Sequence, residues 1–204
     1  LIIDNYEDDK IEYLDVPNNQ ENPELGTRKV PFGKRLYIER EDFKIEPPRK
    51  YFRLFPENEV RLMSAYFVKC VSYETDADGN VTVVHCTYDP ETKSGSGFTG
   101  RKVKGTIHWV CAPTAKTAEV RLYENIVDEE KGVYNEDGTV NVNPNSLTIL
   151  NNCYVEPALA EAKPGDKFQF MRTGFFCVDT KDSTEDHPVF NRIVSMKSSY
   201  RPNK

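Results

Sequence analysis

The sequence predicts an all-β protein built from two antiparallel β-barrels. Apolar residues recur with a period of two in runs rich in Val, Ile, Tyr and Phe, whereas helical periodicity is weak. The 13 prolines and 11 glycines separate these runs. Many short strands at regular spacing are typical of a barrel or a sandwich. A chain of 204 residues favours two small barrels over one.

The strand pattern occurs in residues 11–16, 35–39, 60–73, 81–88, 103–111, 119–123, 167–179 and 189–196. The clearest hairpin joins 65–73 to 81–86, because Asp78-Gly79 supplies the positive φ that a tight turn needs. A second turn is expected at 135–138. Short helical turns are expected at 40–43 and at 155–162, the latter starting near Pro157.

Charge and cysteine usage narrow the protein class. The net charge of −6 argues against a general nucleic-acid binder, but it allows an RNA reader with a local basic groove. The five cysteines are widely spaced and include no C-x-x-C pair, which favours reduced thiols in a cytoplasmic protein over disulfides or a metal site. No apolar run is long enough to span a bilayer, so no membrane partner is expected.

No motif indicates catalysis within this chain. The literal G-x-G-x-x-G at 95–100 follows a polar loop, whereas a dinucleotide site requires a strand before it and a helix after it. The three histidines stand apart from any nucleophile motif. We therefore predict no catalytic residue, no metal site and no cofactor in this chain.

Seven motifs carry a family resemblance. They are LIIDNY at 1–6, VPNNQENPELGTRKVPFGKRLYIEREDF at 16–43, YFRLFPENEVRLMSAYFVK at 51–69, GRKVKGTIHWV at 100–110, EVRLY at 119–123, FQFMRTGFFCVD at 168–179 and HPVFNRIV at 187–194. In this order, the series resembles the C-terminal, anticodon-binding region of the glutaminyl-tRNA synthetases. The family has two ATP-binding motifs, of the His-Ile-Gly-His and Lys-Met-Ser-Lys-Ser types. Both lie upstream of this region in the family, and neither occurs in this sequence.

The resemblance implies a fold and partners. Residues 1–47 plus 118–204 would form the barrel nearer the catalytic domain, and residues 48–117 the farther barrel. The partners would be glutamine tRNA, through its anticodon stem-loop, and the enzyme's own catalytic domain upstream. The whole enzyme would be a monomeric, ATP- and magnesium-dependent class I ligase that attaches glutamine to tRNA.

The resemblance also implies which side chains read the anticodon: Arg53, Arg61, Gln169 and Arg172. In the family the FQF-x-R motif contacts the middle base, a uridine, whose edge suits an amide and a guanidinium. Arg61 matches the residue near the first base. Arg53 matches the residue near the third, a guanine, which arginine favours through O6 and N7. Further RNA contacts are expected at Lys50, Phe52, Lys102 and Lys104.

Strand alternation raises a difficulty within this set. Gln169 and Met171 would face one way and Arg172 the other, so a turn or bulge near Met171 must re-aim Arg172 if both touch one base. Two positions also depart from the family pattern: Met63 and Phe52 stand where basic residues are common. Phe52 can stack on a base, whereas Met63 removes a donor.

Three alternatives remain at this stage. The archaeal and eukaryotic type of glutamyl-tRNA synthetase shares the barrels but meets C at the third anticodon base. A non-catalytic ribosomal-RNA-binding barrel protein would be about half this length and more basic. A protein-interaction β domain would bind no tRNA. Without the resemblance, each arginine reads as a solvated surface charge.

Overall fold

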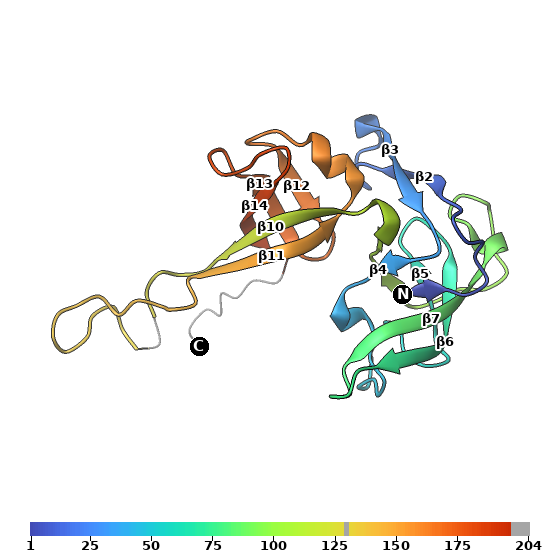
Figure 1. The fold of residues 1–204 in the computed structure, drawn as a ribbon, viewed down its shortest axis with the longest axis horizontal. Helices are drawn as coiled ribbons and strands as arrows, with labels where there is room; N and C mark the ends of the chain where they lie inside the picture. The colour runs from blue at the N-terminus through green and yellow to red at the C-terminus, as the bar shows by residue number, and fades with distance from the viewer. Residues whose placement is uncertain (129–130, 197–204) are drawn as a thin grey trace. The chain divides into compact units, whose positions relative to one another are not determined.

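A computed structural model describes residues 1–128 and 131–196 of the chain. Strands dominate, and the helical elements are short 3-10 turns. Chain contacts divide the protein into two compact units, Leu1–Ala115 and Lys116–Lys204, and the last eight residues of the second lie outside the described part. The predictions of an all-β fold and of two β units are confirmed (Figure 1).

The first unit contains one five-stranded sheet in the order β1-β7-β6-β5-β8 and two strand pairs, β2–β3 and β4–β9. Its strands are β1 (Ile2–Ile3), β2 (Glu12–Pro17), β3 (Thr27–Phe32), β4 (Leu36–Tyr37), β5 (Glu59–Leu62), β6 (Phe67–Thr75), β7 (Val81–Asp89), β8 (Thr106–Ile107) and β9 (Val110–Cys111). The predicted hairpin is β6–β7. Its turn is closed by the Asp76 carboxylate, which accepts from the backbone of Asp78 and Asn80, with Gly79 at φ 81°.

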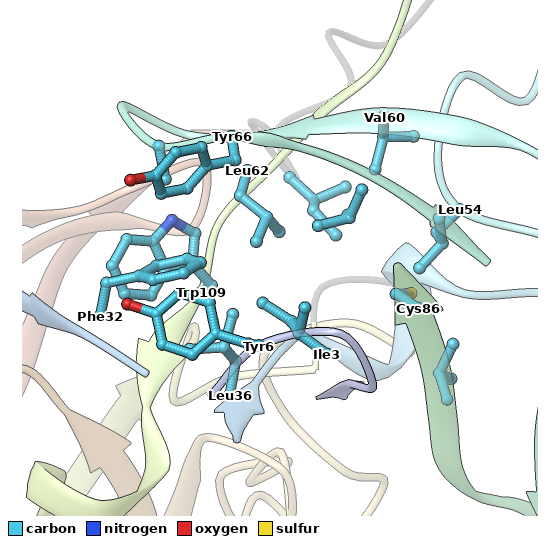
Figure 2. Packing of buried hydrophobic residues seen from close by; sticks show 14 of the residues in the cluster. Ile3, Tyr6, Phe32, Leu36, Leu54, Val60, Leu62, Tyr66, Cys86 and Trp109 are labelled. Carbon is cyan, nitrogen blue, oxygen red and sulfur yellow. The ribbon is translucent and has the colours of Figure 1, made fainter. Parts of the chain in front are cut away.

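Nineteen buried residues form the core of the first unit, and they come from both ends of its sequence. Figure 2 shows Ile3, Tyr6 and Phe32 gathered with Leu62 and Trp109. The Phe32 ring lies 5.1 Å from the Trp109 ring in an edge-to-face arrangement, and 5.4 Å from Tyr6. Such aromatic pairs contribute about 0.5–1.5 kcal/mol each beyond area burial. The N-terminal segment is therefore part of this core.

The second unit contains a five-stranded sheet in the order β11-β10-β14-β13-β12. Its strands are β10 (Lys116–Tyr123), β11 (Leu147–Val155), β12 (Lys167–Phe170), β13 (Gly174–Val178) and β14 (Val189–Ser195), coloured from green to red in Figure 1. Val120, Phe176 and Phe190 lie at its core. Phe170 stacks on Phe176 with ring centroids 4.3 Å apart.

The short helices are 3-10 turns: η1 (Pro23–Leu25), η2 (Arg40–Asp42), η3 (Pro90–Thr92), η4 (Ala112–Thr114) and η5 (Pro157–Glu161). The predicted turns at 40–43 and 155–162 are confirmed as η2 and η5, and Pro157 is the first residue of η5. The described residues include no helix that is long and apolar enough to span a membrane.

The strand predictions differ from the structure in detail. The 60–73 run divides into β5 and β6, because Ser64 at φ 57° turns the chain between them. Only four residues of 103–111 are in strands, and β1, β3 and β11 lie outside all the predicted runs. Three pairings, β1–β7, β5–β8 and β10–β14, are parallel, so the sheets are not purely antiparallel. Closure of each sheet into a barrel stays a prediction.

The division into units also differs from the expected one. Residues 1–47 were expected to group with 118–204, but β1 pairs with β7 in register Ile2↔His85, and β4 pairs with β9. No boundary between units therefore lies between residues 47 and 48, because both belong to the Leu1–Ala115 unit. The second boundary, expected between 117 and 118, lies between Ala115 and Lys116.

Candidate nucleic-acid interface

Arg53 lies in the segment between η2 and β5, beside a buried carboxylate. Its Nε is 3.0 Å from Oδ1 of Asp42, whose side chain is 1% exposed, whereas that of Arg53 is 34% exposed. Its Nη1 also donates to the carbonyl of Phe52 at 3.2 Å. A buried carboxylate requires a charged or hydrogen-bonding partner. Arg53 therefore stabilises this loop in addition to any contact with RNA.

Arg61 lies on β5 and donates hydrogen bonds to the turn between β5 and β6 and to residues 92–94. Its Nη1 donates to the carbonyl oxygens of Ala65 and Thr92, both at 3.2 Å, and to Oγ of Ser94 at 2.9 Å. The guanidinium carbon lies 4.2 Å from the centre of the Phe67 ring. Burial lowers the Arg61 pKa from its ordinary value. All three acceptors are neutral, so the guanidinium retains its charge while its position is fixed.

Three of the four further RNA contacts expected from the sequence line one hollow. Phe52, Lys102 and Lys104 border a space of about 420 Å³ together with Tyr51, Phe55, Asn58, Glu59, Val103 and Gly105. Gly105 is required there, because a Cβ at this position would lie 2.5 Å from the carbonyl oxygen of Phe52. Lys50, the fourth, is not among the lining residues, and it adopts a left-handed φ of 66°.

The hollow combines features that suit an unpaired nucleotide. The Phe52 side chain is 49% exposed, which leaves an aromatic surface for a base. In the described part of the chain, Lys102 and Lys104 have no carboxylate within ion-pairing distance, so their charge is available to phosphate. The sequence analysis missed Tyr51, Phe55 and Asn58. The aromatic spacing of YFRLF was the signal that could have indicated the first two.

Gln169 and Arg172 belong to the hairpin that joins β12 to β13. The Gln169 side chain is exposed, and its Nε2 lies 3.9 Å from Sδ of Met196. β12 ends at Phe170, and the amide of Thr173 donates to the carbonyl of Phe170 at 2.9 Å, which closes a four-residue turn. Arg172 is the third residue of this turn, with φ 64°. The turn required to re-aim Arg172 is therefore present.

The left-handed conformation of Arg172 is unusual for a residue with a side chain. Positive φ at the third position of such a turn normally selects glycine or asparagine. A non-glycine residue there costs about 1–2 kcal/mol. Strain of this kind gathers at functional sites, where the surrounding structure enforces it. Asp9, Lys50, Glu57 and Ser64 also adopt positive φ in the described residues, so this conformation alone does not distinguish Arg172.

Two family models match most of the chain. A family model described as the anticodon-binding domain of class I (E and Q) tRNA synthetases matches residues 1–89, and a second with the same description matches residues 106–179. The chain belongs to this family. The first match falls within the Leu1–Ala115 unit, which carries Arg53 and Arg61. The second extends through the β12–β13 hairpin.

Similar proteins are named glutamine–tRNA ligases. The chain is 55% identical over 206 residues to that of Clostridioides difficile strain 630, 53% identical over 205 residues to that of Clostridium perfringens, and 45% identical over 200 residues to that of Vibrio parahaemolyticus. These alignments include 98–100% of this chain but only 36–37% of each relative. The chain thus spans a little over a third of the length of its relatives.

Proposed function

We propose that this chain is the anticodon-binding part of a glutamine–tRNA ligase and that it binds the anticodon loop of glutamine tRNA. The observation that carries the proposal is the pair of family matches in chain order, joined by 45–55% identity to ligases named for glutamine. These names favour the glutamine reading over the glutamate one. The family match disfavours a ribosomal-RNA-binding barrel and a plain interaction domain.

In the whole ligase, the remaining part of the polypeptide would attach glutamine to the tRNA with ATP and magnesium. No group of three His, Cys, Asp or Glu side chains in the described residues is placed to hold a metal ion. We propose that the whole ligase is a cytoplasmic monomer. Within it, this chain would contact the catalytic domain of the same polypeptide.

The two units would divide the reading of the anticodon. Gln169 and Arg172 in the second unit would meet the middle base, since an amide both donates to and accepts from a uracil edge. Arg61 and Arg53 in the first unit would meet the first and third bases. Unstacked bases in a loop present these edges to side chains and their faces to aromatic rings. Phe52 at the hollow would supply one such ring.

The test is binding of the 204-residue chain to glutamine tRNA and to variants changed at single anticodon bases, all at one salt concentration. Changing the middle uridine should weaken binding by about 1–3 kcal/mol, the usual cost of one wrong base. Changing the third base from G to C tests the glutamate alternative, which would bind the C form more tightly. Equal affinity for every anticodon would contradict the proposal.

The two lysines of the hollow have a separate test. Replacing both Lys102 and Lys104 by alanine should weaken binding of all anticodon variants alike, because phosphate contacts carry no sequence information. The slope of log affinity against log salt should fall by about 0.7 for each lysine that contacts a phosphate of single-stranded RNA. An unchanged slope would remove these lysines from the interface. Lys29, which is paired with Asp15, is a suitable control.

A further inference from the structure

Gln169 has an aromatic neighbour on the adjacent strand. β12 and β13 pair antiparallel, with Gln169 directly opposite Phe175 and Phe168 opposite Phe176. Side chains directly opposite each other on paired strands have Cβ atoms about 4.5–5.5 Å apart. Gln169 and Phe175 therefore lie side by side on one face of the sheet, whereas Phe168 and Phe176 share the other.

The two consecutive phenylalanines of β13 have opposite environments. Phe176 is fully buried and stacks on Phe170, so it belongs to the core. Phe175 points to the other face and is 43% exposed. Core packing explains Phe176. Nothing in the core requires a large aromatic ring at 175, because strand alternation directs that side chain away from it.

The surroundings of Phe175 resemble the elements of a nucleotide site. In the β13–β14 register Phe175 lies opposite Val194, which is 52% exposed, and Met196 beside Gln169 is 50% exposed. Lys167 is the next residue on β12 that points to the same face, and it is exposed. This face therefore offers a flat ring with apolar neighbours, an amide beside it and a cation one step along the strand.

The hairpin is also held firmly. Gly174 has a Cβ position that would overlap the carbonyl oxygen of Val194, so the backbones approach closely where β13 begins. Packing of Phe170 and Phe176 fixes β12 against β13 from the core side. A rigid aromatic platform loses little entropy when a base is placed on it, which favours binding.

We propose that Phe175 is the stacking platform for the base whose edge Gln169 reads. The base would lie with one face on the Phe175 ring and its Watson–Crick edge toward the Gln169 amide, with Lys167 near the adjoining phosphate. Every base has a π-face, so stacking supplies affinity, while the amide supplies discrimination. The inference rests on the proposed function, since it deepens the reading of the middle anticodon base.

The experiment compares affinities of the 204-residue chain and its variants for the glutamine anticodon stem-loop. Phe175→Leu should weaken binding about 5- to 150-fold, the range that loss of one base stack produces. Phe175→Trp should keep most of the affinity. Tyr134→Leu, which removes a 67% exposed aromatic ring elsewhere in the second unit, is the matched control and should leave binding unchanged.

The tryptophan variant gives a direct readout of stacking. The native chain has one tryptophan, Trp109, which is 3% exposed in the other unit, so a new indole at 175 dominates any change. Its fluorescence should be quenched by the stem-loop, but not by a stem-loop that is abasic at the middle anticodon position. This signal decides the matter even if Phe175→Leu impairs folding.

Two different failures are distinguishable. If the unaltered chain discriminates the middle uridine while Phe175→Leu binds within twofold of it and the indole is not quenched, the stacking role is overturned and the proposed function stands. If the unaltered chain binds every middle base equally, the proposed function fails and the stacking role fails with it.

Discussion

Replacement of Arg53 by methionine should destabilise the first unit, because it removes the guanidinium that lies 3.0 Å from the buried Asp42 carboxylate. Removing one member of a fully buried ion pair costs about 3–5 kcal/mol. Asp42 is 1% exposed but Arg53 is 34% exposed, so water reaches the pair from one side. We therefore expect a loss of about 2–3 kcal/mol, at or below the lower end of that range.

The assay is urea unfolding followed by the fluorescence of Trp109, which lies in the core of the first unit and reports on it alone. With a denaturant slope of about 1–3 kcal/mol per molar urea, the midpoint should fall by about 0.7–3 M. Arg49→Met is the matched control, since Arg49 is an exposed arginine in the same loop. It should leave the midpoint unchanged.

A double variant sharpens the test. Adding Asp42→Asn to Arg53→Met should restore part of the lost stability, because a neutral amide costs less to bury than a carboxylate that has lost the Arg53 guanidinium. A midpoint for Arg53→Met equal to that of Arg49→Met would refute the reasoning. The double variant is also a control for function. If Arg53→Met loses tRNA binding, the loss is evidence for reading of the third base only when the more stable double variant has lost tRNA binding as well.

Three further predictions concern other parts of the fold. The protonated His85 ring donates hydrogen bonds to the Asp4 and Glu74 carboxylates, which raises the His85 pKa above 6.5. The stability this histidine contributes is therefore fully present below pH 6.5 and is lost as pH rises through its folded pKa, and His85→Gln should flatten that dependence of the urea midpoint. Gly174→Ala should destabilise the second unit by about 1–3 kcal/mol, measured by thermal unfolding, since the new methyl overlaps a backbone carbonyl of β14. Arg172→Gly should change the stability of the second unit by no more than about 1 kcal/mol, because relief of the left-handed strain offsets the greater backbone freedom of glycine in the unfolded chain. The same variant should bind tRNA more weakly, and unchanged binding would remove Arg172 from the site.

Local patterns predicted the elements that depend on local chemistry. The β6–β7 hairpin follows from Asp-Gly and strict alternation. The turn at Arg172 was expected only on the condition that Gln169 and Arg172 contact one base, a condition that stays a prediction. β11 was missed because Asn151-Asn152 interrupts its apolar run, and most of the strand is exposed. β11 forms although asparagine is uncommon in strands, because it pairs along its length with β10.

Features that depend on long-range pairing could not be predicted in this way. Parallel pairing of β1 with β7 joins residues more than eighty positions apart, and no local pattern at Ile2 and Ile3 indicates it. That pairing places the N-terminal segment in the first unit. The contact of Arg53 with Asp42 could not be predicted either, because the sequence does not distinguish an arginine in solvent from one that pairs with a buried carboxylate.

The acidic net charge and the proposed RNA interface are reconciled by how the basic residues are paired. Arg101 bonds to Glu59 and Asp89, Arg121 to Glu119 and Asp182, and Arg192 to Glu124, so these guanidinium groups are neutralised within the fold. In the described residues, by contrast, Lys102, Lys104 and Lys167 have no carboxylate within 4.0 Å, and the partners of Arg61 are neutral. These three lysines and Arg61 thus offer positive charge to a phosphate, although the net charge of the chain is −6. A chain that repels RNA at long range and attracts it locally should depend on shape and base contacts for specificity. For that reason variants at Gln169 and Phe175 should matter more than a general increase in positive charge.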